Sequence, residues 1–151
     1  MGCASFLKSR SENHIMKRIQ KLIPTAIEAI KAMKLPKVDD KDGIQKIDRE
    51  FNGYISSFGA SIISAGLLPS IIFYSQKGDS TSDRPKVISC IEYVLQKDYG
   101  LTGTLLEKVR SLFTSENNRA EIDRWTNNIS DSAVALKLAI RIYSKSKKDR
   151  T

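Results

Sequence analysis

The sequence is poor in the side chains that most enzymes and metal sites use. It has one histidine, His14, and two cysteines, Cys3 and Cys90, in 151 residues. It contains no Cys/His cluster with the spacing of a zinc site, no glycine-rich phosphate loop ahead of a Lys-Ser/Thr pair and no nucleophile elbow. A lone histidine near the start of a helix is usually a solvent-exposed residue. The sequence therefore predicts neither an enzyme nor a bound metal or cofactor.

The two cysteines do not indicate a disulfide. We expect Cys3 to lie in an N-terminal tail and Cys90 in an apolar helix, which favours a reducing, cytoplasmic compartment. No secretory signal precedes the first predicted helix, and "MGCASF" has Phe6 where a myristoylation signal needs Ser or Thr.

Acidic side chains gather in one loop, at Asp39, Asp40 and Asp42. The remaining ligand positions and the closing glutamate of an EF-hand calcium loop are missing. We therefore expect a solvated acidic loop here.

Charged side chains are absent from residues 51–76, "FNGYISSFGASIISAGLLPSIIFYSQ", a run long enough to cross a bilayer. Its larger residues recur at helical spacing, and its small or polar residues lie off that face: Phe51, Ile55, Phe58, Ile62 and Ala65 against Gly53, Ser57, Ser61 and Ser64. Lipid would surround every face of a lone span, so this one-sided pattern predicts a buried helix of a soluble protein. Gly66 and Pro69 predict a bend, followed by an apolar segment with Leu67, Leu68, Ile71, Ile72 and Phe73.

Four other segments have helical spacing. They are a first helix from about His14 to Lys34, a third starting at Asp83 and Pro85, a fourth from Leu105, and a long last helix whose apolar stripe is Ile122, Trp125, Ile129, Ala133, Leu136, Ile140 and Tyr143. No stretch alternates with period 2, so no sheet is predicted. We expect an all-α protein, a compact bundle of about five or six helices with a bent central apolar helix and a long C-terminal helix. Residues 1–151 would form a single domain, with 1–13 a mobile N-terminal tail and 145–151 a basic C-terminal tail.

The charge is positive and unevenly distributed. The net charge is +8, with 11 Lys/Arg and 7 Asp/Glu in residues 1–50, 4 and 4 in 51–100, and 10 and 6 in 101–151. If the two basic ends pack side by side, the fold has one basic side. Such a chain suits an anionic partner, which is a nucleic acid, an acidic membrane surface or an acidic protein; the alternative is that lysine only provides solubility.

Basic residues line the first and last predicted helices. The candidate phosphate contacts, which the resemblance described below would make RNA contacts, are Lys17, Arg18 and Lys21 on the first helix, and Lys137, Arg141, Lys145 and Lys148 on the last. The second group is spaced by 4, 4 and 3 residues, so on one helix its members would share a face. Few aromatic residues lie among them, which favours contact with phosphates over base stacking.

One motif resembles a known family. The stretch "SAGLLPSIIFYSQK", Ser64 to Lys77, is similar to the hallmark of the small, fifth subunit of the Cmr complex, the type III-B CRISPR-associated RNA-targeting effector. Gly66, Leu67, Phe73 and Lys77 stand at the family's positions. Asp131 and Arg141, in "DSAVALKLAIRIYS", look like the acidic residue and arginine of the family's last helix.

This resemblance implies a non-catalytic small subunit in antiviral defence. Copies would stack along the ribonucleoprotein, with basic faces, including Lys77, on guide and target RNA and other faces on the backbone and large subunits. No membrane contact is implied. Two other functions remain open, a protein-binding adaptor and a basic helical DNA-binding regulator. The regulator would need "KDYGLTGTLLEKVR" to form a helix-turn-helix.

Overall fold

The structure is a computed structural model that describes residues 2–76, 84–116 and 118–146, with only the backbone described for 2–12 and 144–146. Over these residues it has six α-helices and three short strands. The helices are α1 (Gly2–Ala32), α2 (Arg49–Ala65), α3 (Leu67–Ser75), α4 (Arg84–Tyr99), α5 (Leu105–Thr114) and α6 (Arg119–Ala139), followed by a 3₁₀ turn, η1 (Ile140–Ile142). The strands are β1 (Lys37–Val38), β2 (Gln45–Asp48) and β3 (Ser144–Ser146). The predicted helical bundle is confirmed.

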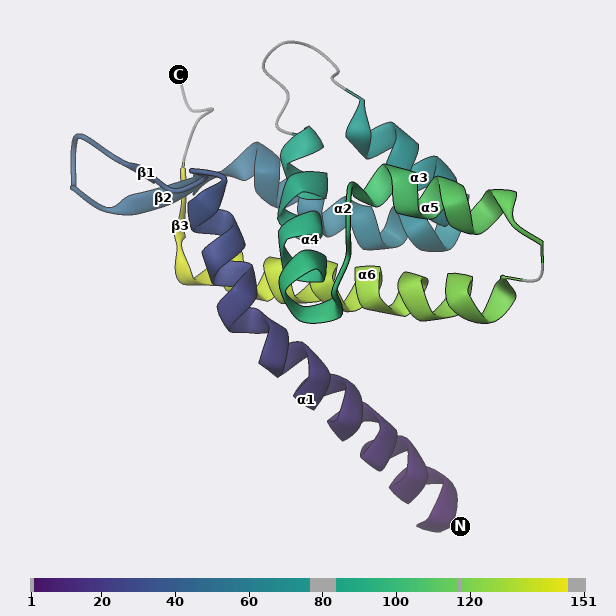
Figure 1. Cartoon of the computed structure of the whole chain (residues 1–151). Coiled ribbons are helices and arrows are strands. Elements are labelled where there is room, and N and C mark those ends of the chain that lie inside the picture. The colour runs from purple at the N-terminus through teal and green to yellow at the C-terminus, as the bar shows by residue number, and fades with distance from the viewer. Residues whose placement is uncertain (1, 77–83, 117, 147–151) are drawn as a thin grey trace.

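Helix α6 is the common support of the bundle. It packs against α1, α2, α4 and α5, while α3 packs against α2, α4 and α5. The N-terminal half of α1 extends beyond the other helices (Figure 1). The helix begins at Gly2 and not near His14, so residues 2–13, expected to form a tail, have a helical backbone. The mobility of that segment stays a prediction.

The uncharged run forms the predicted bent helix. Helix α2 ends at Ala65, Gly66 adopts φ +98° and ψ 166°, and α3 begins at Leu67. Only glycine adopts this conformation without steric cost, which places the bend at Gly66. Pro69 lies in the first turn of α3. Backbone N–H groups in the first turn have no acceptor within the helix, so proline, which lacks an N–H, costs no hydrogen bond there. None of the described helices combines the length and the hydrophobicity that a membrane span requires.

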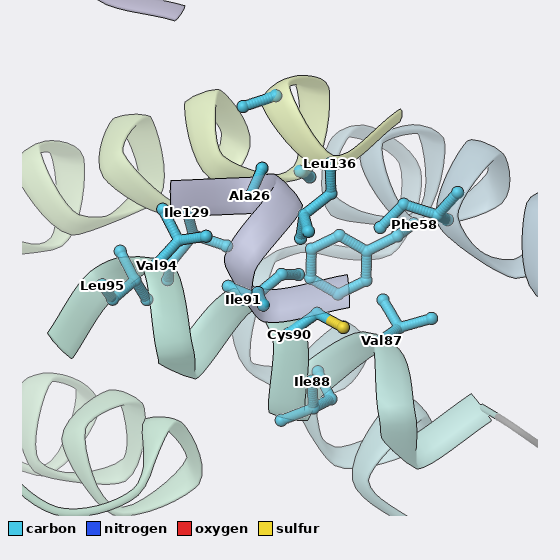
Figure 2. Packing of buried hydrophobic residues seen from close by; sticks show 14 of the residues in the cluster. Ala26, Phe58, Val87, Ile88, Cys90, Ile91, Val94, Leu95, Ile129 and Leu136 are labelled. Atoms are coloured by element: carbon cyan, nitrogen blue, oxygen red, sulfur yellow. The ribbon is translucent and has the colours of Figure 1, made fainter. Parts of the chain in front are cut away.

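The predicted apolar faces form most of the core. In α2 the face with Phe51, Ile55, Phe58 and Ile62 is buried, whereas the last residue of that face, Ala65, is exposed at the helix end. Figure 2 shows Phe58 in one cluster with Ala26 of α1, Leu136 of α6 and the buried side of α4. The Phe58 ring also meets Tyr74 of α3 edge-on, with centroids 5.1 Å apart. This core joins all six helices, since Leu105, Val109 and Leu112 of α5 also belong to it.

The prediction of no sheet is wrong. Strand β1 pairs antiparallel with β2, and β3 pairs parallel with β2. These strands contain two to four residues, too few for an alternating pattern to appear in the sequence. The predicted last helix is also too long, because α6 ends at Ala139 and the chain passes through η1 into β3. Ile140, Ile142 and Tyr143 have modest helix propensity. Once the chain has left the helix, the backbone N–H and C=O groups of β3 form hydrogen bonds with β2.

Candidate nucleic-acid interface

The two basic ends of the chain lie together. Helix α1 packs along α6, and the β2–β3 pairing joins residues 46–48 to residues 144–146 (Figure 1). The two ends of the chain therefore meet, which is the condition under which the fold is expected to have one basic side. This arrangement brings the helix that carries Lys17, Arg18 and Lys21 against the helix that carries Lys137.

Helix α1 presents three of the predicted cations to solvent. Lys17, Arg18 and Lys21 are all exposed on neighbouring turns, and His14 lies beside them on the same shallow surface, exposed as expected. Arg18 differs from the two lysines because its Nε lies 3.2 Å from Oδ2 of Asp131 on α6. Lys17 and Lys21 have no carboxylate partner among the described side chains. The two lysines are thus the freer cations of this group.

Acidic groups border this surface where α1 meets α4. Arg18 and Lys21 line a hollow there with Asp98 and Tyr99. Burial raises the pKa of the Tyr99 hydroxyl, and the nearby carboxylates of Asp131 and Asp98 raise it further. Tyr99 is therefore neutral at physiological pH and adds no negative charge to the hollow.

The four cations expected on one face of the last helix are not on one helix. Lys137 is in the last turn of α6 and lines a groove against α2. Arg141 is in η1, and its side chain is exposed, without a carboxylate partner in the part of the chain that the structure describes. Lys145 is in β3, where its backbone is opposite Ile47, and Lys148 lies outside the described residues, as does Lys77. The prediction that these four cations share one helical face is therefore wrong, because α6 ends at Ala139, before Arg141.

Asp131 and Arg141, the pair suggested by the family motif, are not bound to each other. Asp131 pairs with Arg18 instead. The main alternative to an RNA role for Arg141 is a structural ion pair with a carboxylate at a helix contact. The described residues supply no such carboxylate, so the RNA role of Arg141 stays open as a prediction.

Several cations with defined partners were missed from the sequence. The Arg84 guanidinium lies 4.2 Å from the ring centroid of Phe73 and donates to the carbonyl of Gln76. Lys108 of α5 and Arg124 of α6 lie 5.1 and 5.5 Å from the ring centroid of Trp125. The Arg84–Phe73 and Lys108–Trp125 contacts join different helices, so no local spacing could reveal them.

The acidic loop binds a lysine of its own hairpin. Lys46 Nζ lies 2.8 Å from Oδ2 of both Asp39 and Asp42, while Asp40 is exposed. The hydrogen bonds that Lys46 donates hold the pKa of Asp39 and of Asp42 below the ordinary range. The same hydrogen bonds raise the pKa of Lys46. Lys46 stays protonated, but the two carboxylates compensate its charge, so it is a poor candidate for contact with an RNA phosphate. No group of three His, Cys, Asp or Glu side chains among the described residues could hold a metal ion.

Comparison with protein families decides the identity of the chain. The model of the family described as CRISPR-associated protein (Cas_Cmr5) matches residues 18–127. The chain belongs to the Cas_Cmr5 family. The match includes the motif from Ser64 and ends before Asp131 and Arg141. The resemblance to the small subunit of the type III-B Cmr complex is thus confirmed. Comparisons with curated proteins and with solved structures gave no match.

Proposed function

We propose that this Cmr subunit is a non-catalytic structural component in antiviral defence, which stacks with further copies of itself and contacts guide and target RNA through its basic side. Family membership establishes a CRISPR-associated subunit that assembles with other Cmr subunits. One observation carries the RNA contact. Lys17 and Lys21 from the N-terminal end and Arg141 from the C-terminal end are exposed, and no described carboxylate binds them.

These cations suit phosphates better than bases. Each phosphate that a lysine or arginine neutralises on a single strand releases roughly 0.7 of a condensed counterion, so affinity falls steeply with salt. A few contacts give only weak binding to an isolated copy. Several copies fixed along one scaffold bind cooperatively, because each later contact is effectively intramolecular.

Arg141→Glu tests the RNA contact. The expected result is an unchanged melting temperature, weaker binding of single-stranded RNA and a shallower salt dependence. Arg110→Glu, on the exposed side of α5, makes the same change of net charge and is the matched control. If Arg141→Glu lowers the melting temperature while affinity per folded molecule equals that of the control, Arg141 is structural and the proposed contact is wrong.

The non-catalytic part of the proposal has its own test. The purified chain should leave labelled RNA intact with Mg²⁺ or Mn²⁺, since no nucleophile–base pair was found in the sequence. Metal-dependent cleavage that persists through repurification and disappears in a point variant of this chain would overturn it.

A further inference from the structure

After the first turn of α2, which contains Arg49 and Glu50, the exposed surface formed by α2 and α3 has no charged residue of its own. Its exposed residues are Gly53, Ser56, Ser57, Ala60, Ile63, Ser64, Ala65, Pro69, Ile72 and Phe73. Ile63 is 88% exposed, and Phe73 is 51% exposed with the Arg84 guanidinium of α4 over its ring. In a chain with 28% charged residues, such a surface is unusual. We call it the neutral face. Helix α3 in particular is apolar on its buried and on its exposed side, and an apolar helix surface normally packs against another element.

A groove lies beside this neutral face, between α2 and α6. Its volume is about 270 Å³, and its apolar lining includes Ile55, Ala60 and Ile63 of α2 with Ala133 and Val134 of α6. Lys137 is the one charged residue in the lining. Its ammonium group has no carboxylate partner within the described ranges.

The chemistry of this groove excludes some occupants. A phosphate backbone needs several cations in a row, and an acidic tail needs the same, whereas the groove offers one. Depletion of charge around exposed apolar residues is typical of the core of a protein–protein interface. The single cation beside apolar walls fits an apolar helix that carries one carboxylate.

We propose that the groove between α2 and α6, together with the neutral face, docks an apolar helix of a different subunit of the complex, with a carboxylate of that helix opposite Lys137. The choice of a different subunit rests on the proposed stacking function. Two copies that met through this same face would close into a pair and end the stack. A head-to-tail contact with the next copy is the competing arrangement, and self-association of the isolated protein distinguishes it. Lys137 is then a protein contact, separate from the RNA contacts of Lys17, Lys21 and Arg141.

The test measures how much of each variant is recovered with defined, co-expressed Cmr subunits after affinity purification of another subunit. Ile63→Lys and Lys137→Glu should each lower recovery at least tenfold. Both should keep the wild-type melting temperature, because Ile63 is exposed and Lys137 has no described ion-pair partner. Met16→Lys, at a position on α1 that is 60% exposed, is the matched control and should be recovered as well as the wild type. Recovery of Ile63→Lys at the wild-type level would overturn the proposal.

Two further readings identify other occupants. If light scattering shows a dimer or a longer oligomer for the isolated wild type and a monomer for Ile63→Lys, the face binds a second copy and the assignment to a different subunit is wrong. If Ile63→Lys instead changes RNA affinity, or Lys137→Glu weakens it more than Arg110→Glu does, the groove is a nucleic-acid site. If instead the proposed RNA contact is wrong, Arg141→Glu binds RNA as well as its control, Arg110→Glu. That result is independent of the recovery of Ile63→Lys.

Discussion

Arg18 on α1 and Asp131 on α6 form an ion pair that ties together the two basic ends of the chain. The Nε–Oδ2 distance is 3.2 Å, and the side chains are 53% and 14% exposed, respectively. Because the arginine is half exposed, the pair stabilises the fold by about 1 kcal/mol or less. Its larger effect concerns charge, since the Asp131 carboxylate competes with RNA phosphate for Arg18.

Asp131→Asn should therefore tighten RNA binding at low salt while the free energy of unfolding falls by no more than about 1 kcal/mol. The change frees Arg18, which water can still solvate. Asp123→Asn, at an exposed position of the same helix, makes the same change of charge and should affect affinity less. Equal effects of the two variants on affinity would show that Asp131 does not compete for Arg18.

Phe58→Ala should lower the free energy of unfolding by about 3–5 kcal/mol, the range for a fully buried phenylalanine. Phe58 has no exposed surface and meets the Tyr74 ring edge-on. Ile63→Ala, on the outer side of the same helix, should change it by no more than about 0.5 kcal/mol. Urea denaturation measures both, and a loss below about 1 kcal/mol for Phe58→Ala would mean that the wrong side of α2 has been placed in the core.

The Cys90 thiol should be unreactive in the folded protein. Burial raises its pKa to about 12, and the thiolate is the form that reacts. An unfolded cysteine ionises near pH 8.5, so this group's contribution to stability is complete below that pH. It is lost progressively as pH rises from there toward about 12. Alkylation at pH 8, read by peptide mass spectrometry so that Cys3 is counted separately, should label Cys90 only after denaturant is added. Fast labelling without denaturant would contradict the burial.

The hairpin of β1 and β2 should loosen in acid. Because the pKa of Asp39 and of Asp42 is lowered in the folded chain, their stabilising effect is present above the ordinary aspartate pKa of about 3.9 and is lost as pH falls below it. The amide protons of Lys41 and Ile44 donate to these carboxylates, so their NMR shifts report the change. Lys46→Met should move both transitions to higher pH. If the pH midpoints of both transitions stay unchanged, Lys46 is not what lowers the pKa of Asp39 and of Asp42.

The parts of this fold that depend on neighbours in the sequence could be predicted. The buried sides of α2 and α4 follow from helical spacing, and the bend follows from Gly66, which alone suits the backbone there. The end of α6 could not be predicted, because β3 is stabilised by β2, which lies far away in the sequence. The same holds for the candidate site. Spacing identified the exposed cations of α1, but the partner of Arg18 and the groove around Lys137 arise only when distant helices pack.

The most direct test of the whole account is photo-cross-linking of RNA to this subunit in a reconstituted complex that carries guide and target RNA. Peptides with Lys17, Lys21 and Arg141 should carry the cross-links, whereas residues 53–75 of α2 and α3 should carry none because a partner helix covers the neutral face. Cross-links concentrated on α2 and α3, with none on α1 or around Arg141, would contradict the account.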